Sequence, residues 1–467
     1  MIASRNRRQA RQWTSFILAY AVSWAGLAGA ADTASLGIAF SNMDGVAATA
    51  CDGQFTLELS FEPDAPGLDS DWWLVQLTPA GELRSFDLDS WNFEPGLSPS
   101  YQGPGFALSQ LPIEPECPLP AGVNRFYFGV DSERNASVDF DRLAFDVQPV
   151  KVVAPEGRAR RLSQAATWMY QIQGLDEDGA VDALAATSYP LLVLEPGHNF
   201  TDYPYDTAAM VSALRPNPAG GSRLLLAYVD IGQAEDYRDY WGVDWIAPTE
   251  TSPGSPDFLV SLDPDGWSGN YPTAYWRAAW KALWLGEDGI VAQLARLGFD
   301  GIYLDWVEAY DDDAVRQAAE DDDVVPETEM IRFIEQLGEA GRQVVPDFLV
   351  VPQNAPYLLD SNPDRYIAAI DGLAVEDTWF HGLGDAEWDD PGAGDLHDRH
   401  EDEWSTANRL LQYTRYQAAA IPVFSVDYCV DEDNAASVYR DARLAGLRPL
   451  VTRVALSQMT ETPPENF

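Results

Sequence analysis

Gly-Phe-Asp-Gly-Ile-Tyr-Leu-Asp-Trp, residues Gly298–Trp306, is the stretch that decides the fold of this chain. Its centre, Gly301 to Leu304, predicts a short buried strand that ends on the carboxylate of Asp305. Barrels of alternating strands and helices place catalytic acids at the C-terminal tips of their strands. An aspartate in that place can equally cap the following helix. Taken alone, the stretch leaves both interpretations of Asp305 open.

Outward from this stretch, strand-like and helix-like segments alternate from Thr167 onward. Seven apolar runs predict strands, at Met169–Ile172, Leu191–Leu194, Leu224–Val229, Gly301–Leu304, Phe348–Val351, Gly372–Val375 and Val423–Val426. An eighth strand is expected at 258–262 or at 271–274. Apolar residues at helical spacing, as in 330–337 and 404–416, predict helices between them.

This alternation predicts an α/β fold with a parallel sheet. About eight units over roughly 300 residues is the size of a (β/α)8 TIM barrel, which is the fold we expect. A doubly wound sheet is the alternative. The sequence has neither the Gly-x-Gly-x-x-Gly motif nor the P-loop that would favour nucleotide binding.

The first 30 residues have the layout of a signal peptide. Four arginines between residues 5 and 11 precede an apolar run at 16–27 and an Ala-x-Ala cleavage site that ends at Ala30. We therefore expect a secreted or periplasmic protein with no membrane attachment after cleavage.

Residues 31–150 predict an all-β sandwich that precedes the barrel, because short alternating runs are separated by Gly and Pro. The Pro- and Gly-rich stretch 101–120 is expected to be a loop. We expect a linker at 151–164 and the barrel at 165–460. Trp72, Trp73 and Trp91 could form a sugar-stacking platform, but packing in the core is the favoured interpretation.

The charge of the chain excludes several partners. It has 467 residues with 74 Asp and Glu against 29 Lys and Arg, for a net charge of −45. Such a charge repels nucleic acid and anionic lipid. Adaptation to salt and attraction of a cationic substrate are both compatible with it. The oligomeric state is left open.

The chain has three cysteines. Cys51 and Cys117 lie in the same region of an exported chain and are expected to form a disulfide. Cys429 follows an apolar strand and is expected to be a buried free thiol. The four histidines are scattered along the chain, and no Cys/His group has zinc spacing. No metal or other cofactor is expected.

Polar residues gather at the ends of the predicted strands. They are Tyr170, Gln171, Gln173, Glu195, Tyr228, Asp230, Gln233, Glu235, Asp305, Trp306, Glu308, Gln353, Asn354, Glu376, Asp377, Ser425, Asp427 and Tyr428. The set contains no Ser-His-Asp or Cys-His arrangement. Carboxylates with amides and aromatics are what glycoside hydrolysis needs. One carboxyl protonates the leaving oxygen, and the other attacks the anomeric carbon or activates water.

Each of these residues also has a structural interpretation. Asp230 precedes Ile231-Gly232 and could simply make a turn. Gln353 and Asn354 could satisfy loop backbone. Glu376 follows Val375 directly, so its charge requires a partner or a pocket.

Several ordered motifs resemble glycoside hydrolase family 114, the endo-α-1,4-polygalactosaminidase-like barrels. They are Tyr170–Ile172, Ala227–Glu235, Phe299–Asp305, Gln353-Asn354 and Val375-Glu376, and they cover roughly residues 165 to 455. One departure is Glu195-Pro196-Gly197, where the family pattern has an Asp after the second strand. This departure leaves details of the substrate open.

The resemblance implies that Asp305 and Glu376 are the catalytic pair of a retaining hydrolase, with Asp305 as nucleophile and Glu376 as general acid/base. The substrate would be a polysaccharide of α-1,4-linked galactosamine or N-acetylgalactosamine, cleaved without a cofactor. The substrate-binding residues would be Tyr170, Gln171, Glu195, Tyr228, Asp230, Glu235, Trp306, Gln353, Asn354 and Asp427. The alternative is a non-catalytic carbohydrate-binding or exopolysaccharide-matrix protein, against which the intact Asp305 and Glu376 argue.

Overall fold

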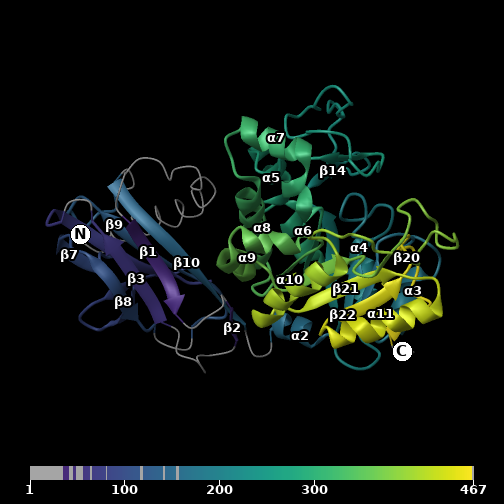
Figure 1. The fold of residues 1–467 in the computed structure, drawn as a ribbon, viewed down its shortest axis with the longest axis horizontal. Coiled ribbons are helices and arrows are strands. Elements are labelled where there is room, and N and C mark those ends of the chain that lie inside the picture. Colours follow the sequence, from purple (N-terminus) through teal and green to yellow (C-terminus); the bar gives the residue numbers. More distant parts are fainter. Residues whose placement is uncertain are drawn as a thin grey trace. The chain divides into compact units, whose positions relative to one another are not determined.

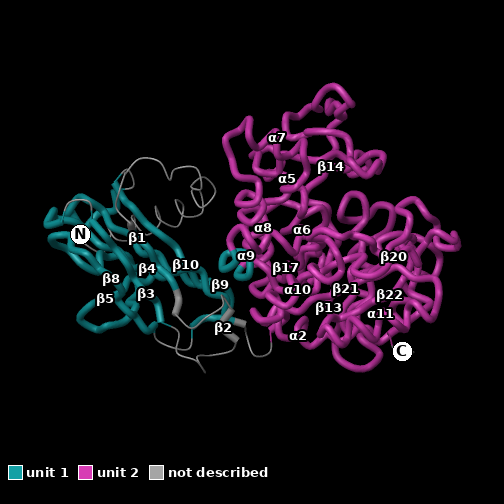
Figure 2. The backbone as a smooth tube through the Cα atoms, viewed as in Figure 1, with its two compact units in different colours: residues 1–155, 363–368 teal, residues 156–362, 369–467 magenta. Residues whose placement is uncertain are grey.

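The fold is described from a computed structural model over residues 35–41, 46–48, 56–63, 66–79, 81–115, 119–139, 142–153 and 157–464. The chain divides into two compact units, residues 1–155 with 363–368 and residues 156–362 with 369–467 (Figure 2). The expected signal peptide and both Cys51 and Cys117 lie outside the described residues. No helix in the described ranges is long and apolar enough to cross a membrane.

The described part of the first unit is rich in strands. They are β1 (Ser35–Ser41), β2 (Val46–Ala48), β3 (Thr56–Glu62), β4 (Asp69–Leu77), β5 (Leu83–Asp87), β6 (Asn92–Pro95), β7 (Tyr101–Pro104), β8 (Leu108–Ile113), β9 (Gly122–Asp131) and β10 (Leu143–Val153). One sheet has the order β1-β3-β8, and the other has the order β2-β10-β9-β4-β5-β6 with β7 beside β4.

Apolar side chains from both sheets of the first unit form one hydrophobic core. Phe61 of β3 meets Trp72 of β4 edge to face, with ring centroids 5.3 Å apart. Trp72 and Trp73 are only 5% and 3% exposed, so they pack in the interior as favoured from the sequence. Trp91 is 50% exposed.

The stretch 101–120, expected to be a loop, contains two strands, so that expectation is wrong. β7 pairs with β4, and β8 pairs antiparallel with β3 with Ile113 opposite Leu57. The loop was expected because the stretch is rich in Pro and Gly, and one of these prolines, Pro112, lies within β8. A proline is tolerated there because β8 is an edge strand that needs hydrogen bonds on one side only.

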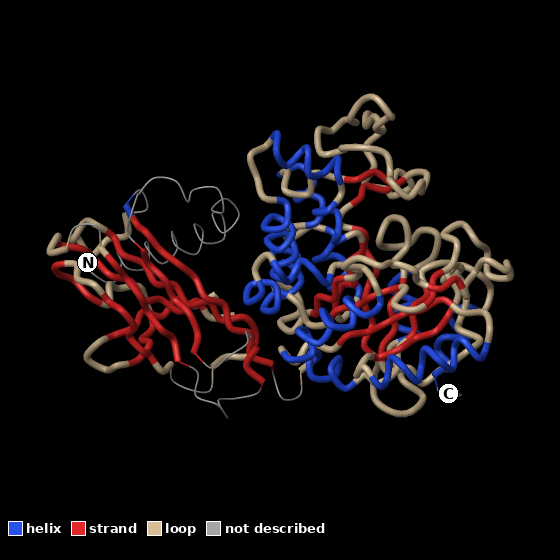
Figure 3. The backbone as a smooth tube through the Cα atoms, in the orientation of Figure 1, coloured by secondary structure: helices blue, strands red, loops and turns tan. Residues whose placement is uncertain are grey.

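The second unit has a mixed α/β fold, with strands in its interior and helices outside them (Figures 1 and 3). Its parallel strands are β11 (Met169–Gln171), β12 (Leu191–Leu194), β13 (Leu224–Asp230), β16 (Gly301–Asp305), β17 (Leu349–Pro352), β18 (Leu373–Glu376), β21 (Val423–Tyr428) and β22 (Arg448–Thr452). Short antiparallel pairs are β14 (Gln233–Glu235) with β15 (Asn270–Pro272), and β19 (Phe380–His381) with β20 (Leu396–His397).

Helices alternate with these strands. They are α2 (Arg158–Gln164), α3 (Ala180–Ala186), α4 (Thr207–Leu214), α5 (Ala278–Trp284), α6 (Ile290–Leu297), α7 (Asp313–Asp321), α8 (Pro326–Arg342), α9 (Pro363–Ala369), α10 (Thr406–Ala418) and α11 (Glu432–Leu444), with 3-10 turns η2 (Val307–Asp311) and η3 (Pro356–Asp360). The helices predicted at 330–337 and 404–416 correspond to α8 and α10.

The eighth parallel strand is β22, so both positions expected for it are wrong. Residues 258–262 form no strand, and 270–272 form β15, which pairs antiparallel with β14. β22 begins with Arg448-Pro449, which reads as a strand breaker, and only Leu450 and Val451 continue an apolar run. The strand is held by its parallel ladder with β21 rather than by a strong local preference.

The eight parallel strands do not close into one hydrogen-bonded ring. Five form the sheet β11-β12-β13-β16-β17 and three form β18-β21-β22. A single parallel bridge, Gln353 with Ala374, connects them on one side. On the other side no ladder joins β22 to β11 within the described ranges. Aromatic rings nevertheless share one interior, since Trp168 lies 5.6 Å from Phe424 of β21 and 6.0 Å from Tyr170 of β11.

Near the N-terminal end of the stretch Gly298–Trp306, the buried side chain of Asp300 fixes the chain in place. Its carboxylate accepts hydrogen bonds from the Leu225 backbone N–H at 2.9 Å and from the Arg158 Nε at 2.6 Å, and it also pairs with Arg215. Arg158 begins α2, in the segment expected to be a linker. The two aspartates of the stretch therefore lie at opposite ends of β16, and only Asp305 reaches the C-terminal edge.

Two glycines allow β16 to lie where it does. Gly298 ends α6 in the left-handed region, with φ 102°. At Gly301 a Cβ would lie 2.5 Å from the Cβ of Leu349 and 2.8 Å from Leu226 Cδ2, so only glycine fits between β13 and β17. The strand is thereby packed closely enough to present Asp305 beside the ends of its neighbours.

Candidate active site

Asp305 ends β16 directly opposite Asp230 of β13. The Tyr228 hydroxyl donates a hydrogen bond to Asp305 Oδ2, and the Trp306 backbone N–H donates to Oδ1 at 2.8 Å. Burial raises the pKa of Asp305, and these two donors oppose the rise. Asp305 does not cap a helix, because its carboxylate is bound by a tyrosine and by the next residue.

Glu376 ends β18 and is held by three neutral donors. Gln353 Nε2 and Asn354 Nδ2 donate to Oε2, the latter at 2.7 Å, and the Tyr428 hydroxyl donates to Oε1. Burial, followed by the negative charge of Asp305, raises the pKa of Glu376 to about 7 against the effect of these donors. A carboxyl with a pKa near the working pH can both give and take a proton.

Three consecutive strand ends share an unusual backbone. Trp306 after β16, Asn354 after β17 and Asp377 after β18 have φ values of 53°, 55° and 55°. Left-handed backbone is unfavourable for residues with a Cβ, and such residues cluster at functional sites. The geometry turns the chain sharply after each strand, which leaves the preceding side chain at the edge.

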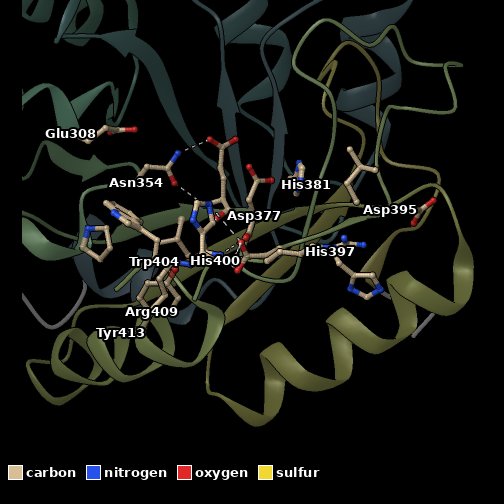
Figure 4. A pocket seen from close by; sticks show the side chains of 16 residues that line it. Glu308, Asn354, Asp377, His381, Asp395, His397, His400, Trp404, Arg409 and Tyr413 are labelled. Atoms are coloured by element: carbon tan, nitrogen blue, oxygen red, sulfur yellow. Dashed lines mark hydrogen bonds and ion pairs between the residues drawn. The ribbon is translucent and has the colours of Figure 1, made fainter. Parts of the chain in front are cut away.

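A cavity of about 840 Å³ opens at this edge (Figure 4). Glu376, Glu308, Asn354 and Asp377 line it, whereas Asp305 is not among the lining residues. Arg409, which also lines the cavity, donates hydrogen bonds to the backbone oxygens of Glu376 at 3.1 Å and Asp377 at 2.6 Å. These bonds hold the backbone that follows β18.

Glu308 and Asp377 each bring an unsatisfied carboxylate oxygen to this cavity. Glu308 Oε2 and Asp377 Oδ1 are buried and have no hydrogen-bond partner in the described part of the chain. Burial first, then the charges of Asp305 and Glu376 respectively, raise the pKa of both carboxyls well above the usual range. The sequence placed both at strand ends but did not select them for the site.

Glu195 and Glu235, both expected to bind substrate, are joined by a buried arginine. Arg238 Nη1 lies 2.6 Å from Glu195 Oε1, and Arg238 Nε lies 2.8 Å from Glu235 Oε2. The Arg238 side chain is 0% exposed. Tyr237 also donates to Glu235. Arg238 was missed because nothing in the sequence places it beside Glu195.

Several other expected site residues bind backbone. Asp230 Oδ1 accepts from the N–H groups of Gly232 at 3.0 Å and Gln233 at 2.7 Å, which is the turn considered from the sequence. Asp427 Oδ1 accepts from the N–H groups of Trp379 and Phe380. Gln171 donates to the Ser457 carbonyl at 3.0 Å.

The remaining expected residues support the two carboxyls. The Tyr170 hydroxyl donates to Gln353 Oε1 at 3.3 Å, so Tyr170 reaches Glu376 through that amide. Tyr428, which also donates to Glu376, is a strand-end residue that the sequence collected without assigning a role. Its signal was its position directly after Asp427 at the end of the last predicted strand.

Comparison with known proteins places the chain in a family. The family model described as glycoside-hydrolase family GH114 matches residues 151–466. The chain belongs to glycoside-hydrolase family GH114. A protein of Deinococcus radiodurans is 30% identical over 319 residues, which are 68% of this chain and 90% of that protein. A protein of Thermotoga maritima is 31% identical over 224 residues, which are 46% of this chain and 60% of that protein.

Among solved structures, the GH114 chain is similar to the glycoside hydrolase domain of PelA from Pseudomonas aeruginosa, with 16% identity, a TM-score of 0.43 and coverage of 62% of this chain and 96% of that one. It is also similar to Ega3 of Aspergillus fumigatus in complex with galactosamine, with 14% identity and a TM-score of 0.43. That match covers 63% of this chain and 94% of the Ega3 chain.

Membership in GH114 confirms the resemblance read from the sequence, and it makes the chain a glycoside hydrolase with a polysaccharide substrate. A glycoside hydrolase needs two carboxyls of different proton affinity at one site. Asp305 at the end of β16 and Glu376 at the end of β18 are the candidates for these two carboxyls.

Proposed function

We propose that this chain is a secreted retaining hydrolase that cleaves α-1,4 linkages in polysaccharide containing galactosamine or N-acetylgalactosamine, with Asp305 and Glu376 as its catalytic pair. The observation that carries the proposal is the Glu376 carboxyl, which lines the cavity and, within the described ranges, is bound by neutral donors only. Burial and the charge of Asp305 raise its pKa to about 7. The parallel strands β11 to β22 support a (β/α)8 barrel as its scaffold.

In the first step the Asp305 carboxylate attacks the anomeric carbon while Glu376 gives its proton to the glycosidic oxygen. The bond to that oxygen breaks, and a glycosyl ester forms on Asp305. In the second step Glu376, now ionised, removes a proton from water, which attacks the same carbon and releases Asp305. Tyr228 and the Trp306 N–H stabilise the Asp305 carboxylate each time it is free.

The amino sugar is proposed from the family resemblance and is supported by the charge around the cavity. Glu308 and Asp377 each have a carboxyl oxygen without a partner in the described part of the chain. An ammonium group of the sugar would supply that partner and favour the ionised form of the carboxyl against the effect of burial. The net charge of −45 would also attract a cationic polymer.

Secretion is proposed from the signal-peptide layout of residues 1–30, and a Cys51–Cys117 disulfide would suit an exported chain. Cys429 is buried and free, as predicted from the sequence.

The proposal is tested with defined oligomers of α-1,4-linked galactosamine and N-acetylgalactosamine, and with α-1,4-linked glucose oligomers as a control. We expect shorter products by mass from one or both amino-sugar series and none from the glucose series. Binding without any shortened product would instead favour the non-catalytic carbohydrate-binding protein.

A further inference from the structure

One part of the cavity wall carries an arginine and several histidines, against the composition of the chain. His381, His397, His400 and Arg399 all line the cavity. They include three of the four histidines in a chain with 74 acidic residues and only 29 Lys and Arg. These histidines look scattered in the sequence, but the fold brings all three to the wall of one cavity. An acidic, salt-adapted surface does not account for such a group.

Arg399 has no counter-ion in the described part of the chain. Its side chain is exposed and makes no ion pair or hydrogen bond with described residues. Arg409, the other arginine of the cavity, differs in this respect, because it is buried and lies 2.9 Å from Asp398 Oδ2. Only Arg399 therefore has a guanidinium available to a ligand.

The acids on the same part of the wall already have partners. Asp395 accepts from the Asp431 backbone N–H and from Asn434 Nδ2, both at 3.0 Å. Asp398 accepts from Arg409 and from Thr406 Oγ1. The oxygens of these two carboxylates are thus bound by groups other than Arg399, and Asp398 Oδ1 also lies 3.9 Å from His400 Nε2.

The carboxyl oxygens without a hydrogen-bond partner among the described residues, Glu308 Oε2 and Asp377 Oδ1, belong to another part of the cavity wall. Figure 4 shows Glu308 and Asn354 toward one end and His381, His397 and Asp395 toward the other. The cavity therefore offers these carboxyl oxygens on one part of its wall and the guanidinium of Arg399 on another. His381 Nδ1 lies 3.2 Å from the Gly382 carbonyl oxygen, which leaves its Nε2 for a ligand. Within the described ranges no group of three His, Cys, Asp or Glu could hold a metal ion, so the histidines are not explained by metal binding.

We propose that Arg399, with His381 and His397, forms a subsite for an anionic group, a carboxylate or a sulfate, carried by a sugar of the polysaccharide. The subsite rests on the proposed function, because it deepens the substrate of the same cavity. The planar guanidinium of Arg399 can bind such a group through two parallel hydrogen bonds, and imidazole N–H groups add donors. The substrate would then carry anionic sugars beside its amino sugars.

The test measures binding separately from hydrolysis. The Asp305→Asn variant is titrated by calorimetry, at low salt, with α-1,4-linked trigalacturonate and with the neutral N-acetylgalactosamine trimer. Galactose 6-sulfate and galactose form a second pair. We expect an anionic probe to bind more tightly than its neutral counterpart. Adding Arg399→Ala should weaken that binding about tenfold and leave the neutral probes unchanged.

Arg160→Ala is the matched control. Arg160 is another exposed arginine of the second unit with no side-chain partner in the described part of the chain, and its loss changes the net charge equally. Arg160→Ala should leave all binding unchanged. Tighter binding of trigalacturonate alone assigns a carboxylate, and tighter binding of the sulfated sugar alone assigns a sulfate.

The proposal is overturned if neither anionic probe binds more tightly than its neutral counterpart, or if Arg399→Ala and Arg160→Ala act equally. Cleavage of galactosamine oligomers by the unaltered enzyme is read in a separate assay. A failure of the anion-binding test therefore does not imply that the enzyme fails to cleave galactosamine oligomers, and the converse also holds.

Discussion

Two pairs of carboxyls lie at the strand ends of the second unit, and they differ in what neutralises them. Glu195 and Glu235 share the buried guanidinium of Arg238. Asp305 and Glu376 receive hydrogen bonds from neutral donors only. The sequence pattern is the same in both cases, an acid directly after or near an apolar strand. The partner of the acid, rather than its position, distinguishes the two pairs.

The difference has a physical consequence. In a buried carboxyl pair with a cation, the cation opposes the effect of burial, as Arg238 opposes the rise that burial causes in the pKa of Glu195. A buried pair without one has at least one member whose pKa rises, as burial and Asp305 raise the pKa of Glu376 to about 7. We infer that the pair with Arg238 supports the site and the pair without a cation performs the chemistry.

The largest expected effect is that of Glu376→Gln on the rate. The variant cannot give or take the proton, so kcat on a galactosamine oligomer should fall by about 100- to 10,000-fold. Product mass over time measures it. Glu387→Gln, an exposed acid of the same unit, is the control and should retain the full rate. A Glu376→Gln enzyme as fast as the control would remove this residue from the mechanism.

Removing the cation shared by Glu195 and Glu235 should lower the stability of the fold. Arg238→Met leaves Glu195 and Glu235 without their cation and should lower the free energy of unfolding by about 3–5 kcal/mol. Urea denaturation measures the change. Arg316→Met, which removes an exposed ion pair with Asp311, should cost at most about 1 kcal/mol. Equal effects of the two variants would contradict the structural role of Arg238.

The raised pKa of Glu376 predicts a pH-dependent loss of stability. In the folded state the pKa is about 7 against an ordinary value of 4.5, so this contribution is present below pH 4.5 and is lost as the pH rises through 7. Glu376→Gln cannot ionise. Its free energy of unfolding relative to the unaltered enzyme should therefore rise by about 3 kcal/mol between pH 4 and pH 8. A difference that does not change with pH would mean that the pKa is not raised.

The smallest expected effect is a shift of the pH profile. The Tyr428 hydroxyl stabilises the ionised form of Glu376, so Tyr428→Phe should raise the pKa of Glu376 and move the alkaline limb of kcat upward by less than about one pH unit. Asp305→Asn removes a negative charge and should lower the same pKa, read by NMR titration. Shifts of the same sign in both variants would contradict the arrangement.

Much of the second unit could be predicted because its strands are continuous apolar runs. β12 matches its expected bounds, and the other predicted parallel strands differ by one or two residues. β22 could not be found, since its Arg-Pro start hides a strand that depends on its ladder with β21. The closed ring of the expected barrel is absent from the described ladders, because hydrogen bonding across distant strands has no local signal.

The site was predictable at the level of its strand-end acids and not at the level of their partners. Asp305 and Glu376 carry a motif and a position that sequence can show. Arg238 reaches Glu195 across 43 positions, and Arg399 joins His381 from a separate loop, so neither relation is visible along the chain. Contacts of this length decide which acids are neutralised.

The most direct measurement of the central claim compares the unaltered enzyme with Asp305→Asn on an α-1,4-linked galactosamine hexamer, with binding and product mass read in parallel. We predict that both proteins bind the hexamer and that only the unaltered enzyme shortens it. Equal cleavage by Asp305→Asn would contradict the claim that Asp305 and Glu376 carry the reaction.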